Sequence, residues 1–185
     1  MFEYASAGKW LELLKEINPT IVRAAVIRDP AITAGIGQWA AIQTAASSLG
    51  MDVAAINVRE AGEIERTVDS FAGSPNGALV VTGSALAVVH RELIIALAGK
   101  HKLPAVYFQR SFVDRGGLVS YGPDLVDQYR QAAGYVDRLL RGEKPADLPI
   151  QAPAKYETVV NLQTAKALGL TMPSSVIARA DVVIE

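Results

Sequence analysis

Apolar residues recur along the chain in two alternating patterns, which predict strands and helices in turn. Short, nearly continuous apolar runs, such as IVRAAVI at 21–27 and ALVV at 78–81, are typical of strands buried on both faces. Longer stretches place apolar residues three and four positions apart, as in AGEIERTVDSF at 61–71, which is typical of amphipathic helices. We therefore predict strands at 21–27, 52–58, 78–81, 103–108, 118–121 and 156–162, and helices at 7–17, 36–49, 61–71, 85–100, 124–141, 162–169 and 173–180.

Strands and helices that alternate in this way predict an α/β fold, a doubly wound parallel sheet with flanking helices. Residues 1–122 are expected to form this α/β lobe. Residues 123–185 add a long helix, a proline-rich crossing segment, a late strand and a terminal helix that returns to the lobe. The helix at 36–49 has the inward candidates Ile36, Ala40, Ile42 and Ala46. The predicted buried stripe of the long helix consists of Leu125, Tyr129, Ala132, Ala133, Val136 and Leu140.

The composition excludes several classes of function. The chain has 185 residues, a net charge of −1 and no cysteine. Near neutrality gives no electrostatic reason to bind nucleic acid or an anionic membrane. No disulfide or thiolate chemistry is possible, and two histidines, His90 and His101, do not suit a histidine-rich metal centre. No apolar run reaches the ~18 residues of a membrane helix. The start MFEYASAGKW lacks a signal-peptide pattern, so the chain is expected in the cytoplasm if Met1 is its native start.

Polar residues follow the carboxyl ends of the predicted strands. Because these ends share one edge of a parallel sheet, and open α/β sheets bind ligands there, that edge is the candidate site. The residues that follow the strands include Arg28, Asp29, Thr82, Gly83, Ser84, Arg110, Ser111, Gly122, Pro123 and Asp124. Arg110 is of a type that holds a carboxylate with two hydrogen bonds. Amide groups that open a helix, as at Gly83, can receive an anion.

Several of these candidates also have a purely structural interpretation. Thr82 and Ser84 precede a predicted helix and suit its cap as well as they suit a ligand. Arg28 and Asp29 can pair with each other or with solvent. Asp124 suits a helix start because the helix dipole favours an acidic residue there. Both interpretations stay open from the sequence alone.

Enzyme signatures are missing from the sequence. It has no glycine-rich dinucleotide motif after a strand, no P-loop and no G-x-S-x-G. Solute binding without catalysis, cofactor or metal is therefore the leading interpretation. Two alternatives stay open: an enzyme for a small acid at the same edge, with Asp124 or His90 as its acid–base group, and a non-catalytic regulatory module.

Three stretches carry a resemblance to a known family: GGLVSYGPD at 116–124, LRGEKPADLPIQAP at 140–153 and NLQTAKALGL at 161–170. With them, the chain resembles the uncharacterised ABC-transporter substrate-binding proteins, which have the type I periplasmic-binding-protein fold. The resemblance covers essentially the whole chain, but only the second lobe and the C-terminal part of those proteins. It implies two α/β lobes with the ligand between them, so the candidate edge becomes one wall of a cleft.

The resemblance also implies residues and partners. The positions that match cleft-facing loops are Arg28, Asp29, Thr82, Gly83, Ser84, Arg110, Ser111, Tyr121, Gly122, Pro123 and Asp124. Tyr121 is a candidate on this ground alone. The implied solute is an amino acid or small organic acid, the implied partner an ABC transporter permease and the implied location the periplasm. In the family, the helix at 124–141 lies against the first lobe. Without that lobe we expect its stripe to be exposed and to be covered in a homodimer, through this helix or the late strand.

Overall fold

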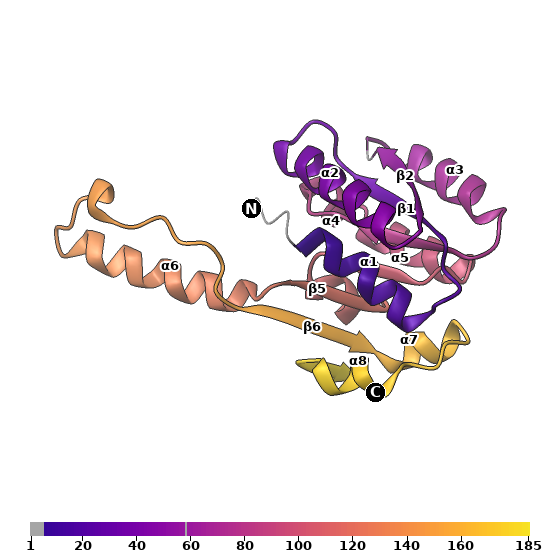
Figure 1. Ribbon diagram of the computed structural model, residues 1–185. Helices are drawn as coiled ribbons and strands as arrows, with labels where there is room; N and C mark the ends of the chain where they lie inside the picture. The colour runs from indigo at the N-terminus through magenta and orange to yellow at the C-terminus, as the bar shows by residue number, and fades with distance from the viewer. Residues whose placement is uncertain (1–5, 58) are drawn as a thin grey trace.

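The computed structural model describes residues 6–57 and 59–185, which form a seven-stranded sheet with helices on both faces (Figure 1). The strands are β1 (Arg23–Arg28), β2 (Asp52–Asn57), β3 (Gly77–Val81), β4 (Ala105–Tyr107), β5 (Val119–Pro123), β6 (Tyr156–Asn161) and β7 (Val182–Ile184). The α-helices are α1 (Ser6–Ile17), α2 (Thr33–Ser48), α3 (Ala61–Ala72), α4 (Ala85–Val89), α5 (Arg91–Lys100), α6 (Leu125–Leu140), α7 (Leu162–Ala167) and α8 (Ser174–Arg179). The 3₁₀ helices are η1 (Arg110–Arg115) and η2 (Pro145–Asp147).

The sheet has the strand order β2-β1-β3-β4-β5-β6-β7. Its first five strands are parallel, and Ile27 of β1 pairs with Ile56 of β2 on one side and Val81 of β3 on the other. The chain order reverses between β1 and β3, as in doubly wound sheets, so the predicted fold class is confirmed. β6 runs antiparallel to β5, and β7, which the sequence analysis missed, is parallel to β6. These two strands make the sheet mixed rather than wholly parallel.

The sheet separates two apolar cores. Successive side chains of a strand point to opposite faces, so Val26 of β1 belongs to the core under α1 and α2, and Ile27 to the core under α3 and α5. Trp10 and Ile42 are buried in the first core, and Ile64 is buried in the second. Because both faces of the central strands are covered, β1 is apolar and buried from Ala24 to Ile27 and β3 is buried along its whole length, which explains the continuous apolar runs in the sequence.

The helices differ from the prediction in two places. The predicted helix at 85–100 is broken at His90, which ends α4 and directly precedes α5. In α2, Ile42 and Ala46 are buried as expected, but Ile36 is 56% exposed and Ala40 is also exposed. Gln38 takes a place on the buried face instead. The predicted strand at 52–58 includes residue 58, which lies outside the described residues. None of the described helices is both long and apolar enough to cross a membrane.

α6 and the segment 141–155 that follows it form an arm, which projects from the sheet (Figure 1). The return segment is tied to the helix by Tyr135, whose hydroxyl donates to the Pro149 carbonyl at 2.6 Å. No residue of α6 is buried. The prediction that its stripe is buried is therefore wrong for this chain: Tyr129 is 77% exposed and Leu140 is 83% exposed. Most of the stripe is uncovered, which agrees with the expectation that it is exposed when the first lobe is absent.

Candidate ligand-binding site

A cavity of about 250 Å³ lies at the carboxyl edge of the parallel strands. Its walls come from α1, from the residues after β1, β3 and β4, and from the β5–α6 junction. The lining residues are Ser6, Trp10, Ile32, Ala34, Gln38, Gly83, Phe108, Gln109, Pro123 and Leu125. All of these side chains are neutral, and most of them are apolar. The cavity therefore suits an uncharged group with a few polar atoms better than an ion.

Phe108, directly after β4, forms an aromatic wall of this cavity. Its ring meets the Phe112 ring edge-on, with 5.6 Å between the centroids. Two glycines make room for it. A Cβ on Gly83 would lie 3.2 Å from the Phe108 ring, and a Cβ on Gly122 would lie 1.9 Å from the Phe108 carbonyl oxygen. Because a backbone approach as close as that at Gly122 has no space for a side chain, this glycine fixes where the Phe108 wall stands.

Trp10 of α1 forms a second aromatic wall. Its indole Nε1 donates to the Tyr121 carbonyl oxygen at 2.8 Å, which joins α1 to β5. The ring is otherwise packed into the core, with an exposed fraction of 1%. The hydrogen bond satisfies the only donor of the indole and locks the orientation of the ring. The wall is thus rigid before any solute arrives.

Gln38 is the polar side chain of α2 that reaches the cavity. It lies on the buried face of the helix, with an exposed fraction of 7%. The Gly83 backbone amide donates to Gln38 Oε1 at 3.3 Å, a long hydrogen bond that joins α2 to the turn after β3. This contact orients the side-chain amide.

The Thr82-Gly83-Ser84 turn divides between structural and cavity positions. Thr82 is fully buried, and its hydroxyl donates to the Ile27 carbonyl at 2.9 Å. Ser84 caps α4, because its hydroxyl oxygen accepts from the Ala87 amide at 3.0 Å. The structural interpretation therefore describes Thr82 and Ser84, whereas Gly83 lines the cavity.

Arg28 and Asp29 hold the start of the β1–α2 loop and do not line this cavity. The Arg28 guanidinium lies over the Trp39 ring, 5.3 Å from its centroid, and Nε donates to Asn57 Oδ1 at 3.3 Å. Asp29 is 7% exposed, and its Oδ1 accepts from the Ala31 amide at 2.9 Å, which forms a local turn. The two residues thus bind other groups, and the suggested pair between them does not form.

Arg110, Ser111 and Asp124 lie together in a second, larger groove of about 610 Å³, which shares Pro123 and Leu125 with the first cavity. Unlike the first cavity, this groove is rich in charged side chains. They are Arg110, Asp114, Asp124, Lys155, Glu157 and Asp181. The edge that the sequence suggested as a site therefore contains two chemically different hollows.

Ion pairs join five of the six charged side chains of this groove, all except Asp181. Arg110 Nε lies 3.2 Å from both carboxylate oxygens of Asp114, and its Nη1 lies 3.9 Å from Glu157 Oε2. A hydrogen bond from Lys155, followed by one from a backbone amide of α6, holds the pKa of Asp124 below its ordinary value. Burial raises the pKa of Glu157, an effect that the more distant Arg110 only partly offsets. Asp124 thus stays ionised at neutral pH, as a helix cap and a salt-bridge partner.

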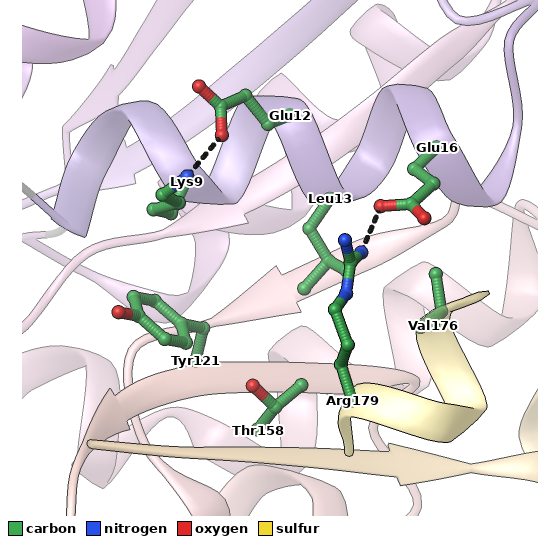
Figure 2. A pocket seen from close by; sticks show the side chains of 8 residues that line it. All are labelled: Lys9, Glu12, Leu13, Glu16, Tyr121, Thr158, Val176 and Arg179. Carbon is green, nitrogen blue, oxygen red and sulfur yellow. Dashed lines mark hydrogen bonds and ion pairs between the residues drawn. The ribbon is translucent and has the colours of Figure 1, made fainter. Parts of the chain in front are cut away.

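Tyr121 lies apart from the other candidates. Its side chain lines a third cavity of about 290 Å³ between α1, α8 and the β5–β6 pair (Figure 2). Figure 2 shows Tyr121 beside Thr158, with the Lys9–Glu12 and Glu16–Arg179 ion pairs along α1. The ring stacks on Tyr156 with 5.7 Å between the centroids. The Tyr121 side chain therefore does not contribute to the carboxyl-edge cavity, although its carbonyl holds Trp10.

Sequence reasoning missed Trp10, Gln38 and Phe108 as cavity residues. The one available signal was Gln38, which lies four residues before Ile42 and therefore on the same helix face as Ile42 and Ala46. Buried glutamines are uncommon, so a glutamine on this face is informative. The aromatic residues gave none, because their positions are equally typical of a core. Tyr107, the residue before Phe108, is buried in the core. In the described part of the chain, no three His, Asp or Glu side chains are grouped as a metal would require.

The doubly wound sheet with helices on both faces has the fold of a type I periplasmic binding protein. Residues 3–184 match the family model described as ABC transporter substrate binding protein, and the chain belongs to this family. Members of the family are solute-binding proteins of the periplasm or the cell exterior and are not enzymes. The family predicted from the three sequence stretches is thus confirmed.

Several relatives are similar over almost all of this chain. A tyrosine-binding protein of Clostridioides difficile (strain R20291) is 23% identical over 168 residues, 91% of this chain and 48% of that protein. The crystal structure of an ABC domain from Streptococcus pneumonia in complex with L-Trp matches with a TM-score of 0.86 and 25% identity, over 96% of this chain and 62% of the other. A conserved domain protein from Vibrio cholerae matches with the same TM-score and identity, over 96% and 60%. This chain therefore spans between about half and three fifths of the length of these relatives.

Proposed function

We propose that this chain supplies one wall of the solute-binding cleft of an ABC import system, and that the solute is an amino acid with an aromatic side chain. The observation that carries the proposal is the neutral cavity walled by Trp10 and Phe108. Aromatic walls with a few amide groups suit the ring of such a solute. Two relatives support this class, because one is named for tyrosine and another is a complex with L-Trp.

We further propose that the charged end of the solute lies toward the second groove. The groove adjoins the cavity at Pro123 and Leu125, so a solute can extend from one hollow into the other. Arg110 and Ser111 there remain candidate contacts for a carboxylate, and Asp124 for an ammonium group. We assign direct contact to Gly83 as well, and supporting roles to Arg28, Asp29, Thr82, Ser84 and Tyr121.

We also propose that a second lobe completes the cleft, that a permease is the partner and that the protein works in the periplasm or outside the cell. A lone wall leaves a solute open to water, which lowers its affinity. The greater length of the relatives and the uncovered stripe of α6 support a second lobe. For this chain by itself, we propose that a homodimer covers the stripe.

A thermal-shift screen of the whole chain tests the proposed solute class. Aromatic L-amino acids at millimolar concentration are compared with aliphatic L-amino acids and with small organic acids. A ligand that binds only the folded state at a hundredfold excess over its dissociation constant adds about 2.7 kcal/mol of stability, which raises the melting temperature. We expect a shift with aromatic amino acids alone.

Matched variants locate the binding. Phe108→Ala removes an aromatic wall of the cavity, whereas Tyr129→Ala removes an exposed aromatic ring from α6, outside it. We expect the ligand-dependent shift to disappear in the first variant and to persist in the second. Equal shifts with aliphatic and aromatic solutes, or no shift with any, would refute the proposed solute class.

A further inference from the structure

We infer that Gln38 is a specificity-determining residue, which donates a hydrogen bond to an uncharged oxygen on the ring of the solute and so selects a phenol over a plain phenyl ring. This inference rests on the proposed function and names the chemical group of the solute that the cavity recognises. Gln38 is suited to this role because it is a polar side chain, buried by its helix, that opens into the neutral cavity.

The orientation of the Gln38 amide follows from its one contact. The Gly83 amide donates to Oε1, so Oε1 is used as an acceptor and Nε2 is turned away from Gly83. A side-chain NH₂ group has two donors and no acceptor capacity. Among the residues that the structure describes, no acceptor is found for Nε2, and this atom is not one of the enclosed, unpaired polar atoms of the chain. It is therefore available to a ligand in the cavity.

The position of Gln38 on α2 argues that a ligand, rather than packing, accounts for a polar residue there. Ile42 and Ala46 continue the same face and are buried in the apolar core. A leucine or methionine at position 38 would extend that core, whereas the glutamine keeps a donor, Nε2, that is open to the cavity. A solute oxygen can accept from this donor in place of water.

The other lining residues indicate which chemical group of the solute bears that oxygen. Every lining side chain in the described part of the chain is neutral, so a carboxylate here would lack a compensating cation among them, and an uncharged oxygen is the better acceptor. The volume of about 250 Å³ is sufficient for a substituted ring, since about 150 Å³ of apolar cavity holds benzene. Phe108 supplies an aromatic surface, and the buried Trp10 backs the cavity. A phenol has both the apolar ring and the single oxygen that these groups require.

Isothermal titration of the whole chain with L-tyrosine and L-phenylalanine tests this inference. Loss of one buried hydrogen bond, about 1.4 kcal/mol, corresponds to about tenfold in affinity, so we expect L-tyrosine to bind about tenfold more tightly. Gln38→Leu removes the donor, and we expect the two dissociation constants to become equal, mainly because that of L-tyrosine rises. Gln38→Glu keeps an acceptor for the Gly83 amide but has no donor, and it should lose the preference as well.

Gln43 provides the matched control, because it lies on the same helix but is exposed to solvent. Gln43→Leu and Gln43→Glu should keep the tenfold preference. Wild-type binding of both solutes with equal affinity, or a preference that survives in both Gln38 variants, overturns the role of Gln38 and leaves the proposed function intact. Binding of neither solute overturns the proposed function together with this inference.

Discussion

Lys155 Nζ lies 2.9 Å from Asp124 Oδ2, across the two chain segments from which the α6 arm projects. The backbone repeats the connection, because the Asp124 amide donates to the Lys155 carbonyl at 3.0 Å. Asp124 also caps α6 by accepting from the Asp127 amide. One carboxylate thus closes the base of the arm and begins its helix, at the point where the chain leaves the lobe.

The first prediction concerns the pH dependence of the Asp124–Lys155 ion pair. The pKa of Asp124 is lowered in the folded state, chiefly by Lys155. Its contribution to stability is therefore present above the ordinary aspartate pKa of about 3.9, and is lost as pH falls through the lower folded value. Lys155→Met should raise the pKa of Asp124 toward the ordinary value. An NMR titration of the Asp124 carboxyl carbon measures this change, and an unaltered pKa would show that Lys155 is not its cause.

The second prediction concerns Gly122, which holds the Phe108 wall in place. Gly122→Ala puts a Cβ where the Phe108 carbonyl oxygen lies 1.9 Å away, and backbone cannot yield as a side chain tip can. We expect a loss of about 3 kcal/mol of unfolding free energy, at the upper end for overpacking, measured by urea denaturation. Gly134→Ala is the control, because nothing lies within 4 Å of its Cβ position on α6. It should leave stability unchanged or raise it by up to about 1 kcal/mol. Equal effects of the two substitutions would contradict this account.

The order of strands and helices was predictable because each element carries its own local pattern. The buried runs of β1 and β3 and the spacing in α3 identify their elements without reference to the rest of the chain. Strand direction has no such signal, and the antiparallel course of β6 depends on how the arm returns to the sheet. The capping role of Ser84 was one of two interpretations that residue type alone allowed, and its contact with the Ala87 amide shows that role.

The cavity was less predictable, because its walls meet only in three dimensions. The Trp10–Tyr121 hydrogen bond joins residues 111 positions apart, and no local pattern contains such a contact. Gln38 was missed for another reason. α2 is rich in alanine and glycine, so its apolar residues do not define one face clearly, and Ile36 was placed inward although it is exposed. Charged residues after strands were more conspicuous, which favoured the groove of Arg110 over the neutral cavity.

The third prediction compares two buried hydroxyl groups. Ser120 of β5 is fully buried, and its Oγ has no hydrogen-bond partner within the described chain. Ser120→Ala should therefore leave the unfolding free energy unchanged or raise it by about 1 kcal/mol, since an unpaired donor is removed. Thr82→Val is the opposite case, because the Thr82 hydroxyl donates to Ile27. It should cost about 1 kcal/mol. Urea denaturation of both variants checks the difference, and a larger loss in Ser120→Ala would indicate that its hydroxyl has a partner.

The last prediction concerns the uncovered stripe of α6. Tyr129 and Leu140 are among its most exposed apolar residues, and contiguous apolar surface of this kind marks an interaction site. If two copies of this chain cover the stripe in each other, sedimentation equilibrium should show a dimer that forms with rising concentration. The double variant Tyr129→Glu with Leu140→Glu should stay monomeric, because it would bring four carboxylates into that interface. Its melting temperature at low concentration should not change, since no residue of α6 is buried.

A matched variant tests whether added negative charge by itself prevents dimerisation. Thr33→Glu with Gln43→Glu adds the same charge to exposed positions of α2, away from the stripe, and should dimerise as the wild type does. A wild-type chain that stays monomeric at the highest concentration would exclude the homodimer and leave a second lobe as the proposed cover. If both double variants dimerise, the dimer contact does not use the α6 stripe. The late strand β6 is then the next segment to alter.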